Sequence, residues 1–442
     1  MSVTLNRITP GSVHETLRRS ILADGFDVVL DLDKSHGVRL HDSRSGKTFL
    51  DMFSCFASAP LGFNHPRLVD PEFVAKLGRV AVTKPSNSDL YTVEMAEFVD
   101  AFARLATPPA LPHLFFVEGG TLGVENALKT AMDWKVRKNV AAGRGEIGHQ
   151  IMHFRECFHG RSGYTLSLTN TAPVKTMYFS KFDWPRITNP KLHFPVTPAE
   201  LQRVEAEENR AIAEMEAAFA RHQHDICAII LEPIQGEGGD NHFRPEFFRA
   251  LRRLADAHEA FLIFDEVQSG LGLTGRMWAH EHFGVQPDAI CFGKKTQVCG
   301  TAVSRRVEEV EDNVFRVPSR LNSTWGGNLV DMVRCQRILE IMHEENLVEN
   351  AARQGQVLLT GLQSTAARHG DWIDNARGLG LMCAFDVRDA ETRKRLLDGC
   401  TERGLMLVSS GERTIRFRPA LVVDSDDLRE ALDILDSALA AL

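Results

Sequence analysis

Residues 226–266 read ICAIILEPIQGEGGDNHFRPEFFRALRRLADAHEAFLIFDE, and this stretch predicts the fold class. Two short apolar runs, Ile226–Leu231 and Phe261–Phe264, flank a segment, 245–258, whose apolar residues recur at helical spacing. That spacing puts them on one face of a helix, whereas the short continuous runs are typical of buried strands. A strand, a helix and a second strand in this order predict a βαβ unit with two parallel strands.

The same alternation extends outward in both directions. Further strands are expected at 114–117, 151–154 and 289–292, with a helical pattern between the first two. From about residue 331 the pattern changes to two amphipathic helical stretches, then short strands and a terminal helix from Asp426. The fold expected is α/β, a large domain with a mostly parallel sheet flanked by helices plus a smaller α+β domain. The expected division is 1–55, an N-terminal segment packing with the small domain; 56–330, the large domain; and 331–442, the small domain.

Composition limits the possible partners of the chain. It has 442 residues, a formal net charge of −8 and a pI of about 6.1, which argue against a nucleic-acid or membrane-surface protein. The N-terminus lacks the apolar core of a signal peptide, and the apolar runs are too short to span a bilayer. Eight cysteines without a CxxC pair indicate reduced thiols, so we expect a cytoplasmic protein. The histidine pairs 222/224 and 280/282 are two residues apart and do not share a helix face, so no metal site is expected.

Polar residues follow three of the predicted strands. Glu232, Asp265 and Lys294 come directly after the runs ending at residues 231, 264 and 292–293. Ligands of parallel α/β sheets bind beyond the carboxyl ends of the strands. A lysine buried there can have a lowered pKa and form a Schiff base, although an isolated strand-end lysine is more often a solvated surface residue. Its neighbour Lys295 is expected to point elsewhere, because side chains alternate along an extended backbone.

A second candidate binding feature is Gly119-Gly120-Thr121, between the strand at 114–117 and the helix that follows it. Unpaired N–H groups at a helix N-terminus favour an anion such as a phosphate. An ordinary turn is the alternative for this stretch taken alone.

Several motifs together resemble one family. They are 265–276 (DEVQSGLGLTGR), Pro287-Asp288 before Lys294, 232–239 (EPIQGEGG), 158–161 (FHGR), 324–328 (TWGGN) and 416–419 (RFRP). In this order they resemble the class III (ω-amino) aminotransferases, and the resemblance implies the fold type I of pyridoxal-phosphate-dependent transferases. The alternative is a dinucleotide fingerprint at Gly270-x-Gly272-x-x-Gly275, but its acidic partner Asp288 would precede the next strand instead of ending it.

The resemblance implies pyridoxal 5'-phosphate as cofactor and a role for each matching residue. Lys294 is the Schiff-base lysine and the proton carrier, and Asp265 keeps the pyridine nitrogen protonated. Thr324 reaches the phosphate from a second subunit, which implies a homodimer with shared active sites. Further cofactor contacts are implied for Gly120 and Thr121 at the phosphate, for Phe158 and Gln268 at the ring, and for His159 and Glu232.

Two arginines are candidates for substrate carboxylates, since a guanidinium matches that geometry, although either one alone is more often a surface residue. The resemblance implies that Arg416 binds the α-carboxylate of 2-oxoglutarate, and that Arg161 binds its other carboxylate and that of the donor. Glu237 is hypothesised to neutralise Arg416 while an ω-amine reacts. Gln268 and Asn322 are further expected substrate contacts.

Within the class, residues 84–89, 114–129, 158–170, 292–300 and 318–328 resemble the L-lysine 6-aminotransferase subgroup. The implied reaction moves the ε-amino group of L-lysine to 2-oxoglutarate, giving L-glutamate and 2-aminoadipate 6-semialdehyde, which cyclises to piperideine-6-carboxylate. An ornithine- or 4-aminobutyrate-type ω-aminotransferase is the alternative. An isomerase of the aminomutase kind and a non-catalytic homologue are more distant alternatives.

Overall fold

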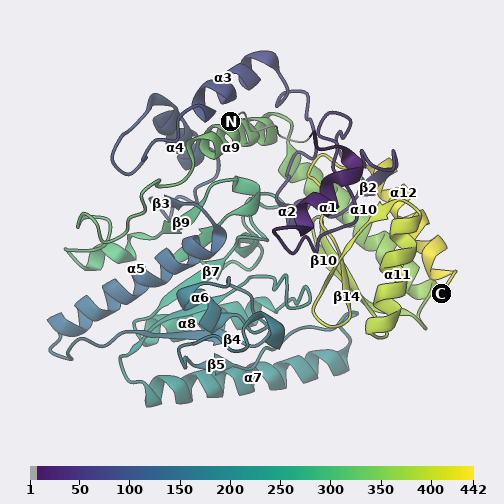
Figure 1. The fold of residues 1–442 in the computed structure, drawn as a ribbon. Helices are drawn as coiled ribbons and strands as arrows, with labels where there is room; N and C mark the ends of the chain where they lie inside the picture. The colour runs from purple at the N-terminus through teal and green to yellow at the C-terminus, as the bar shows by residue number, and fades with distance from the viewer. Residues whose placement is uncertain (1–6) are drawn as a thin grey trace.

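A computed structural model describes residues 7–442, and it confirms the expected α/β fold (Figure 1). The largest sheet has the order β3-β9-β8-β7-β6-β4-β5. Only β9 runs antiparallel to its neighbours among these strands; all other adjacent pairs are parallel. The bounds are β3 His113–Val117, β4 Gln150–Phe154, β5 Arg186–Ile187, β6 Ile226–Leu231, β7 Phe261–Asp265, β8 Ala289–Phe292 and β9 Cys299–Val303.

The central strands are covered by helices on both faces, which explains why their sequences are apolar without alternation. Along β6, Ala228 and Ile230 pack in the cluster that includes α5 (Gly120–Ala141). Ile229 and Leu231 pack in the cluster that includes α8 (Pro245–Ala257) on the other face. Every residue of β6, β7 and β8 is therefore buried. Further helices of this part of the chain are α3 Pro71–Ala81, α4 Val93–Leu105, α6 Gly163–Leu168 and α7 Pro198–Arg221.

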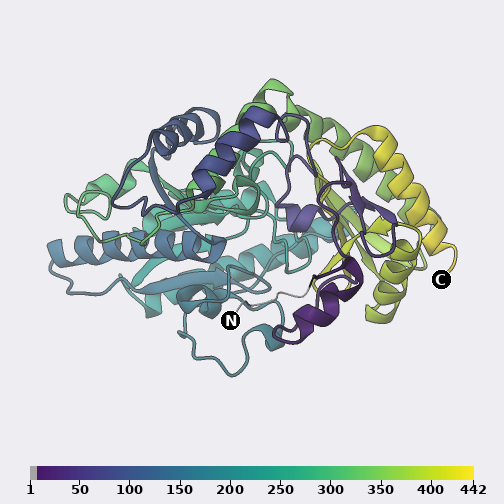
Figure 2. The same ribbon diagram turned by 45° about the horizontal axis from the view of Figure 1, so that its top comes forward.

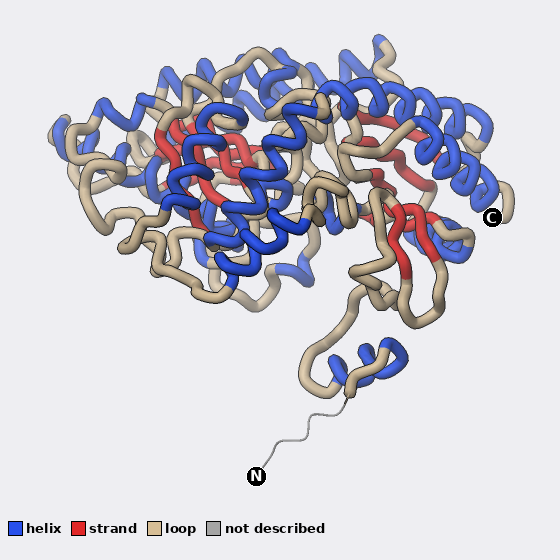
Figure 3. Tube along the Cα trace, turned by 90° about the horizontal axis from the view of Figure 1, so that it is seen from above, coloured by secondary structure: helices blue, strands red, loops and turns tan. Residues whose placement is uncertain are grey.

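A second, antiparallel sheet lies beside the first and is here named the C-terminal sheet. Its strand order is β10-β11-β14-β13. Viewed from above, its strands form a group separate from the large sheet (Figure 3). Three helices, α10, α11 and α12, lie along its outer side (Figure 2). The bounds are β10 Ile373–Leu379, β11 Met382–Val387, β13 Val408–Ser410, β14 Thr414–Phe417, α10 Leu347–Arg368, α11 Ala390–Glu402 and α12 Ser425–Leu439.

The N-terminal segment joins the C-terminal part of the chain through a small third sheet. Its β2 (Thr48–Asp51) pairs with β1 (Arg39–His41) and, in parallel, with β12 (Leu405–Met406). The helix α9 (Leu329–Glu344), although C-terminal to residue 328, packs against α4 of the large part. The division at residues 55 and 330 stays a prediction. Two further short helices are α1 Val13–Arg18 and α2 Ser54–Ala57, of which α1 projects from the body (Figure 3).

Within residues 7–442, no helix is long and apolar enough to cross a membrane. Over the same residues, no group of three or more His, Cys, Asp and Glu side chains is arranged to hold a metal ion.

Candidate active site

Three neighbouring parallel strands bring the predicted carboxylates and lysine to one edge of the large sheet. Asp265 ends β7, Glu232 follows β6, and Lys294 comes two residues after β8. Because β6, β7 and β8 are adjacent, these three residues share the carboxyl edge of the sheet, as the sequence predicted. The structure therefore places the candidate site at the position that the fold favours for ligands.

Lys294 and Lys295 diverge, but for a different reason from the one expected from strand alternation. The strand β8 ends at Phe292, and the lysines begin a 3₁₀ turn, Lys294–Thr296. Lys294 has a φ of 52°, an uncommon backbone conformation for a residue with a side chain. Lys295 is buried and its Nζ donates to the Gln268 carbonyl at 2.6 Å, whereas Lys294 Nζ has no hydrogen-bond or ion-pair partner within residues 7–442. Burial lowers the pKa of Lys294 to about 8, and Arg416 contributes to this shift.

Asp265 is held by a buried histidine. His159 Nδ1 lies 2.7 Å from Asp265 Oδ2, and the Val267 N–H donates to Oδ1 at 3.1 Å. Burial opposes the positive charge of His159, but the Cys157 sulfur and the Asp265 carboxylate outweigh it and raise the pKa of the imidazole well above its usual value. His159 Nε2 is buried without a partner in the described part of the chain. This pair fixes the orientation of the Asp265 carboxylate.

Glu232 connects two loops of the site. Its Oε1 accepts from the Phe158 N–H at 2.9 Å and its Oε2 accepts from the Gly236 N–H at 3.0 Å. Burial raises its pKa to about 7. Since both carboxyl oxygens accept backbone N–H groups, the structure gives Glu232 a loop-ordering function, and its expected contact with a cofactor stays a prediction.

The N-terminus of α5 forms a cradle around the expected anion position. Gly119, with a φ of 99°, precedes the helix, and the N–H groups of Gly120 and Thr121 have no acceptor among the residues that the structure describes. A Cβ on Gly160 would lie 2.0 Å from Thr121 Oγ1, and a Cβ on Gly120 would lie 3.0 Å from Val267. The cradle thus has unpaired donors and walls that exclude larger residues, which suits a phosphate.

Phe158 and Arg161, which precede and follow His159 and Gly160, differ in exposure. Phe158 is half-buried and has Lys175 Nζ 5.5 Å from its ring centroid. Arg161 is exposed and has no hydrogen-bond or ion-pair partner within residues 7–442. Its guanidinium is therefore available to a carboxylate, and this role stays a prediction.

Arg416, on β14, forms a buried ion pair with Glu237 at the same edge. Arg416 Nη2 lies 2.9 Å from Glu237 Oε2; the Arg416 side chain is 1% exposed and that of Glu237 29%. Glu237 also pairs with Lys175. Burial favours protonation of Glu237, but Arg416 and Lys175 outweigh it and lower its pKa. Sequence reasoning missed Lys175, because nothing in the motifs marks it.

Gln268 stands beside this pair. Its Oε1 accepts from Arg416 Nη1 and from Arg418 Nε, both at 3.3 Å. A Cβ on Gly236 would lie 2.4 Å from that oxygen, so the glycine lets the Glu237 loop approach Gln268. The oxygen of Gln268 thus faces arginines, and its predicted contacts with cofactor and substrate are untested by this geometry.

Two of the predicted residues lie on a separate exposed loop. Asn322 and Thr324 are exposed, and the Thr324 carbonyl accepts from Ser86 Oγ at 2.5 Å. Next to them, Lys84 Nζ lies 3.6 Å from the ring centroid of Trp325. Within residues 7–442, no hydrogen bond or ion pair joins Asn322 or Thr324 to Lys294 or Asp265. The expected contacts of Asn322 and Thr324 with substrate and cofactor therefore stay predictions.

The sheet edge carries a buried carboxylate–imidazole pair, a lysine with a lowered pKa and an anion cradle. This geometry fits pyridoxal phosphate. The class-III aminotransferase family model matches residues 22–439, and the chain belongs to that family, whose cofactor is pyridoxal 5'-phosphate. It is 53% identical over 433 residues to the L-lysine-epsilon aminotransferase of Mycobacterium tuberculosis, covering 98% of this chain and 96% of that protein. The protein of the same name from Streptomyces clavuligerus is 49% identical over 97% of this chain and 94% of its own length. A solved structure of lysine aminotransferase from M. tuberculosis has a TM-score of 0.96 at 52% identity, covering 98% of this chain and all of that one.

Proposed function

We propose that the chain transfers the ε-amino group of L-lysine to 2-oxoglutarate, giving L-glutamate and 2-aminoadipate 6-semialdehyde. The Arg416–Glu237 pair is the observation that carries this proposal. Arg416 is almost fully buried, whereas Glu237 is 29% exposed, and we propose that the Glu237 carboxylate leaves Arg416 when the acceptor binds. Such a pair suits two substrates that use one site in turn, only one of which presents a carboxylate to Arg416. Near full-length similarity to proteins named L-lysine-epsilon aminotransferase supports the same substrate.

When bound, pyridoxal phosphate supplies an electron sink for the charge that develops when a proton leaves the amine-bearing carbon. Lys294 is proposed to hold the cofactor and to carry that proton, which its lowered pKa favours because a neutral amine is the competent base. Asp265, oriented by His159, is proposed to face the pyridine nitrogen. Proposed contacts to the cofactor also come from Gly120 and Thr121 at the phosphate, Phe158 and Gln268 at the ring, and Glu232 through the loops it orders.

The carboxylates of the substrates require cations. Arg161, exposed and unpaired in the described residues, is proposed to bind the carboxylate of L-lysine. With L-lysine in the site, Glu237 keeps Arg416 neutralised, because an unpaired buried guanidinium near the reacting carbon is unfavourable. With 2-oxoglutarate, the α-carboxylate replaces Glu237 on Arg416, and Lys175 offers the displaced carboxylate a second cation.

The active sites are proposed to be shared between the subunits of a homodimer. Asn322 and Thr324 lie on an exposed loop with no polar contact to the catalytic lysine of their own chain, within residues 7–442. A second subunit that presents this loop would bring Thr324 to the phosphate and Asn322 to the substrate. All eight cysteines are free thiols, which supports our further proposal that the protein acts in the cytoplasm.

Lysine labelled with ¹⁵N at the ε position tests the reaction directly. The holoenzyme is mixed with this lysine and 2-oxoglutarate, and the glutamate formed is analysed by mass spectrometry. Labelled glutamate together with the cyclised piperideine product is the expected result. Unlabelled glutamate would mean α-transfer and would contradict the proposal. Conversion of lysine without 2-oxoglutarate would indicate an isomerase.

The alternative substrates are shorter ω-amines. Ornithine is one methylene shorter than lysine, and 4-aminobutyrate is two carbons shorter and also lacks the α-amino group; a missing methylene is worth about 1–3 kcal/mol in an apolar pocket. Some turnover of both is therefore expected. A kcat/KM higher for either of them than for L-lysine would favour an ornithine- or 4-aminobutyrate-type enzyme.

A further inference from the structure

The loop that carries Glu237, residues 236–240, is held by the C-terminal sheet and its connections, although it follows β6 of the large sheet. The Glu237 carbonyl accepts from the Gly411 N–H at 3.0 Å. The Asp240 carbonyl accepts from Arg377 Nε at 2.9 Å, and the Gly239 carbonyl accepts from Arg377 Nη2. Residues beyond 370 therefore donate to three of the backbone carbonyls of this loop and help to set where it lies.

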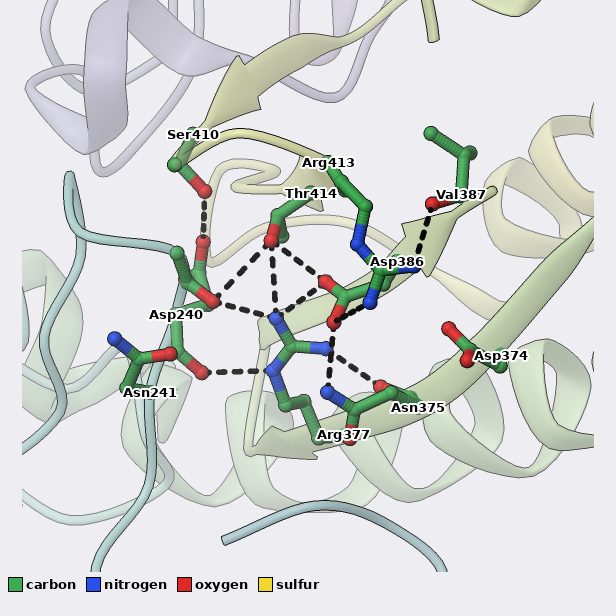
Figure 4. Close-up of polar contacts among 12 residues, drawn as sticks. Asp240, Asn241, Asp374, Asn375, Arg377, Asp386, Val387, Ser410, Arg413 and Thr414 are labelled. Carbon is green, nitrogen blue, oxygen red and sulfur yellow. Dashed lines mark hydrogen bonds and ion pairs between the residues drawn. The ribbon is translucent and has the colours of Figure 1, made fainter. Parts of the chain in front are cut away.

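Arg377 is the centre of these contacts, and its guanidinium is itself fixed (Figure 4). The side chain is 2% exposed, and its Nη2 donates to Asp386 Oδ1 at 2.8 Å. The same Asp386 oxygen accepts from Thr414 Oγ1 at 2.6 Å, while its other oxygen accepts from Asn375 Nδ2 at 2.8 Å. Burial disfavours the charge on Asp386, but Arg377 outweighs it and lowers the pKa of the carboxyl group. Arg377 Nη2 thus donates both to Asp386 and to the Gly239 carbonyl, Nε donates to the Asp240 carbonyl, and Nη1 donates to the Asn375 carbonyl at 2.6 Å.

The strand β14 and the residue that follows it match this loop along one face. Thr414, Arg416 and Arg418 are two residues apart, so their side chains point to the same side of the extended backbone. Thr414 Oγ1 lies 3.4 Å from the Gly239 carbonyl, Arg416 pairs with Glu237, and Arg418 pairs with Asp240. The contact of Glu237 with Arg416 therefore depends on how the whole loop is registered against β14.

The surroundings show how a loosened loop could move. On its inner side the loop has no spare room, because a Cβ on Gly238 would lie 2.0 Å from the Glu156 carbonyl oxygen. On the other side it borders a cleft of 1010 Å³ whose lining includes Gly239, Arg377, Asp386 and Thr414. Without the Arg377 contacts, the carbonyls of Gly239 and Asp240 could be hydrated from this cleft, and the loop would shift toward it.

We propose that Arg377 is a positioning residue: through the Gly239 and Asp240 carbonyls it holds the 236–240 loop where Glu237 meets Arg416. It thereby sets how well the site reacts with an amine donor relative to 2-oxoglutarate. The inference rests on the role proposed above for Glu237. The donor half-reaction needs Glu237 on Arg416, whereas the acceptor half-reaction needs Glu237 displaced, so a misplaced loop affects the two unequally.

The test uses Arg377→Lys in the holoenzyme. Lysine keeps a cation beside Asp386 but cannot donate to that carboxylate and to two carbonyls in a fork. Single-turnover absorbance changes of the bound cofactor give kcat/KM for the reaction with L-lysine and, separately, for the reaction of the aminated enzyme with 2-oxoglutarate. We expect a roughly 10- to 100-fold loss in the lysine half-reaction, since about 1 Å of misplacement has effects of that size, and a much smaller loss with 2-oxoglutarate. Arg368→Lys is the control for the same replacement away from the loop, because Arg368 pairs with Asp436 and makes no hydrogen bond or ion pair with residues 236–240 in the described chain.

Two more variants make the outcome decisive. In a Glu237→Ala background, Arg377→Lys should change the ratio of the two half-reactions no further, because the group it positions is gone. Thr414→Val, which removes one hydroxyl from the same network, should shift the ratio in the same direction by less, and Thr414→Ser should restore it. These variants also serve if Arg377→Lys fails to fold.

The failures are distinguishable. If Glu237→Ala leaves the ratio unchanged, the proposed role of Glu237 is wrong, and that of Arg377 is wrong with it. If Glu237→Ala shifts the ratio but Arg377→Lys and Thr414→Val lower both half-reactions equally, only the role of Arg377 is overturned. A shift of the same size in the Glu237→Ala background would also overturn it, since Arg377 would then act by another route.

Discussion

Cofactor capture by the cofactor-free protein should depend on pH with a midpoint near pH 8. Only the neutral amine of Lys294 can attack the cofactor aldehyde. The pKa of Lys294 is lowered from 10.5 to about 8, mainly because burial disfavours the ammonium form and additionally because Arg416 lies nearby. The capture rate should therefore rise about tenfold per pH unit below pH 8 and level off above it.

The size of the effect at neutral pH follows from this shift. At pH 7 an amine with a pKa of 10.5 is about 0.03% neutral, whereas one with a pKa of about 8 is about 10% neutral. The environment of Lys294 should thus raise the reactive fraction about 300-fold relative to an ordinary lysine. Arg416→Met removes a neighbouring positive charge and should move the midpoint to higher pH.

Stopped-flow absorbance of the cofactor during mixing with the cofactor-free protein measures the capture rate from pH 6 to 10. Nα-acetyl-lysine in the same buffers is the reference, and the ratio of the two rates cancels the ionisations of the cofactor itself. A protein rate that still rises tenfold per unit above pH 9.5 would refute the argument. Lys294→Ala should show no capture. The neighbouring Lys295 does not replace it, because its Nζ donates to the Gln268 carbonyl. This holds although burial and Lys294 lower the pKa of Lys295 to about 7.

Three further predictions concern single residues of the site. Glu237→Ala should impair the half-reaction with L-lysine more than the half-reaction with 2-oxoglutarate in single-turnover assays, and equal losses would contradict the proposed neutralisation of the buried arginine. Gly160→Ala places a Cβ 2.0 Å from Thr121 Oγ1 at a φ of 126°, so it should weaken cofactor retention by about 1–3 kcal/mol, measured by cofactor dissociation with cofactor-free melting as control. Lys294→Ala and Thr324→Trp should each be inactive as homodimers. When the two variants are mixed and their subunits exchange, roughly a quarter of wild-type activity should return, because half of the dimers are then heterodimers with one intact site. Heterodimers that form without any recovery of activity would argue against shared sites.

The central elements of the fold were predictable from the chain. The predicted strand at Ile226–Leu231 and the one at 289–292 have the bounds of β6 and β8, and the predicted helix at 245–258 differs from α8 by one residue. The spacing of apolar residues is enough to predict these elements. Each of them is buried in a regular environment, so apolar residues recur at the intervals that the helix or strand backbone sets. The family, the cofactor and the positions of Asp265 and Lys294 also follow from sequence, since their motifs lie next to these strands.

Contacts between distant segments could not be read in this way. The separation of Lys294 from Lys295 arises from a left-handed backbone conformation after β8 rather than from strand alternation. The link of Arg377 to the Glu237 loop joins residues 137 or more apart, and no local period or spacing encodes it. Such contacts depend on the register of β14 against the loop and on how two sheets lie side by side, and these are properties of packing. The sequence therefore predicted a residue's place in the site where nearby residues determine it. It did not predict which residue it contacts, because that depends on the position of another part of the chain.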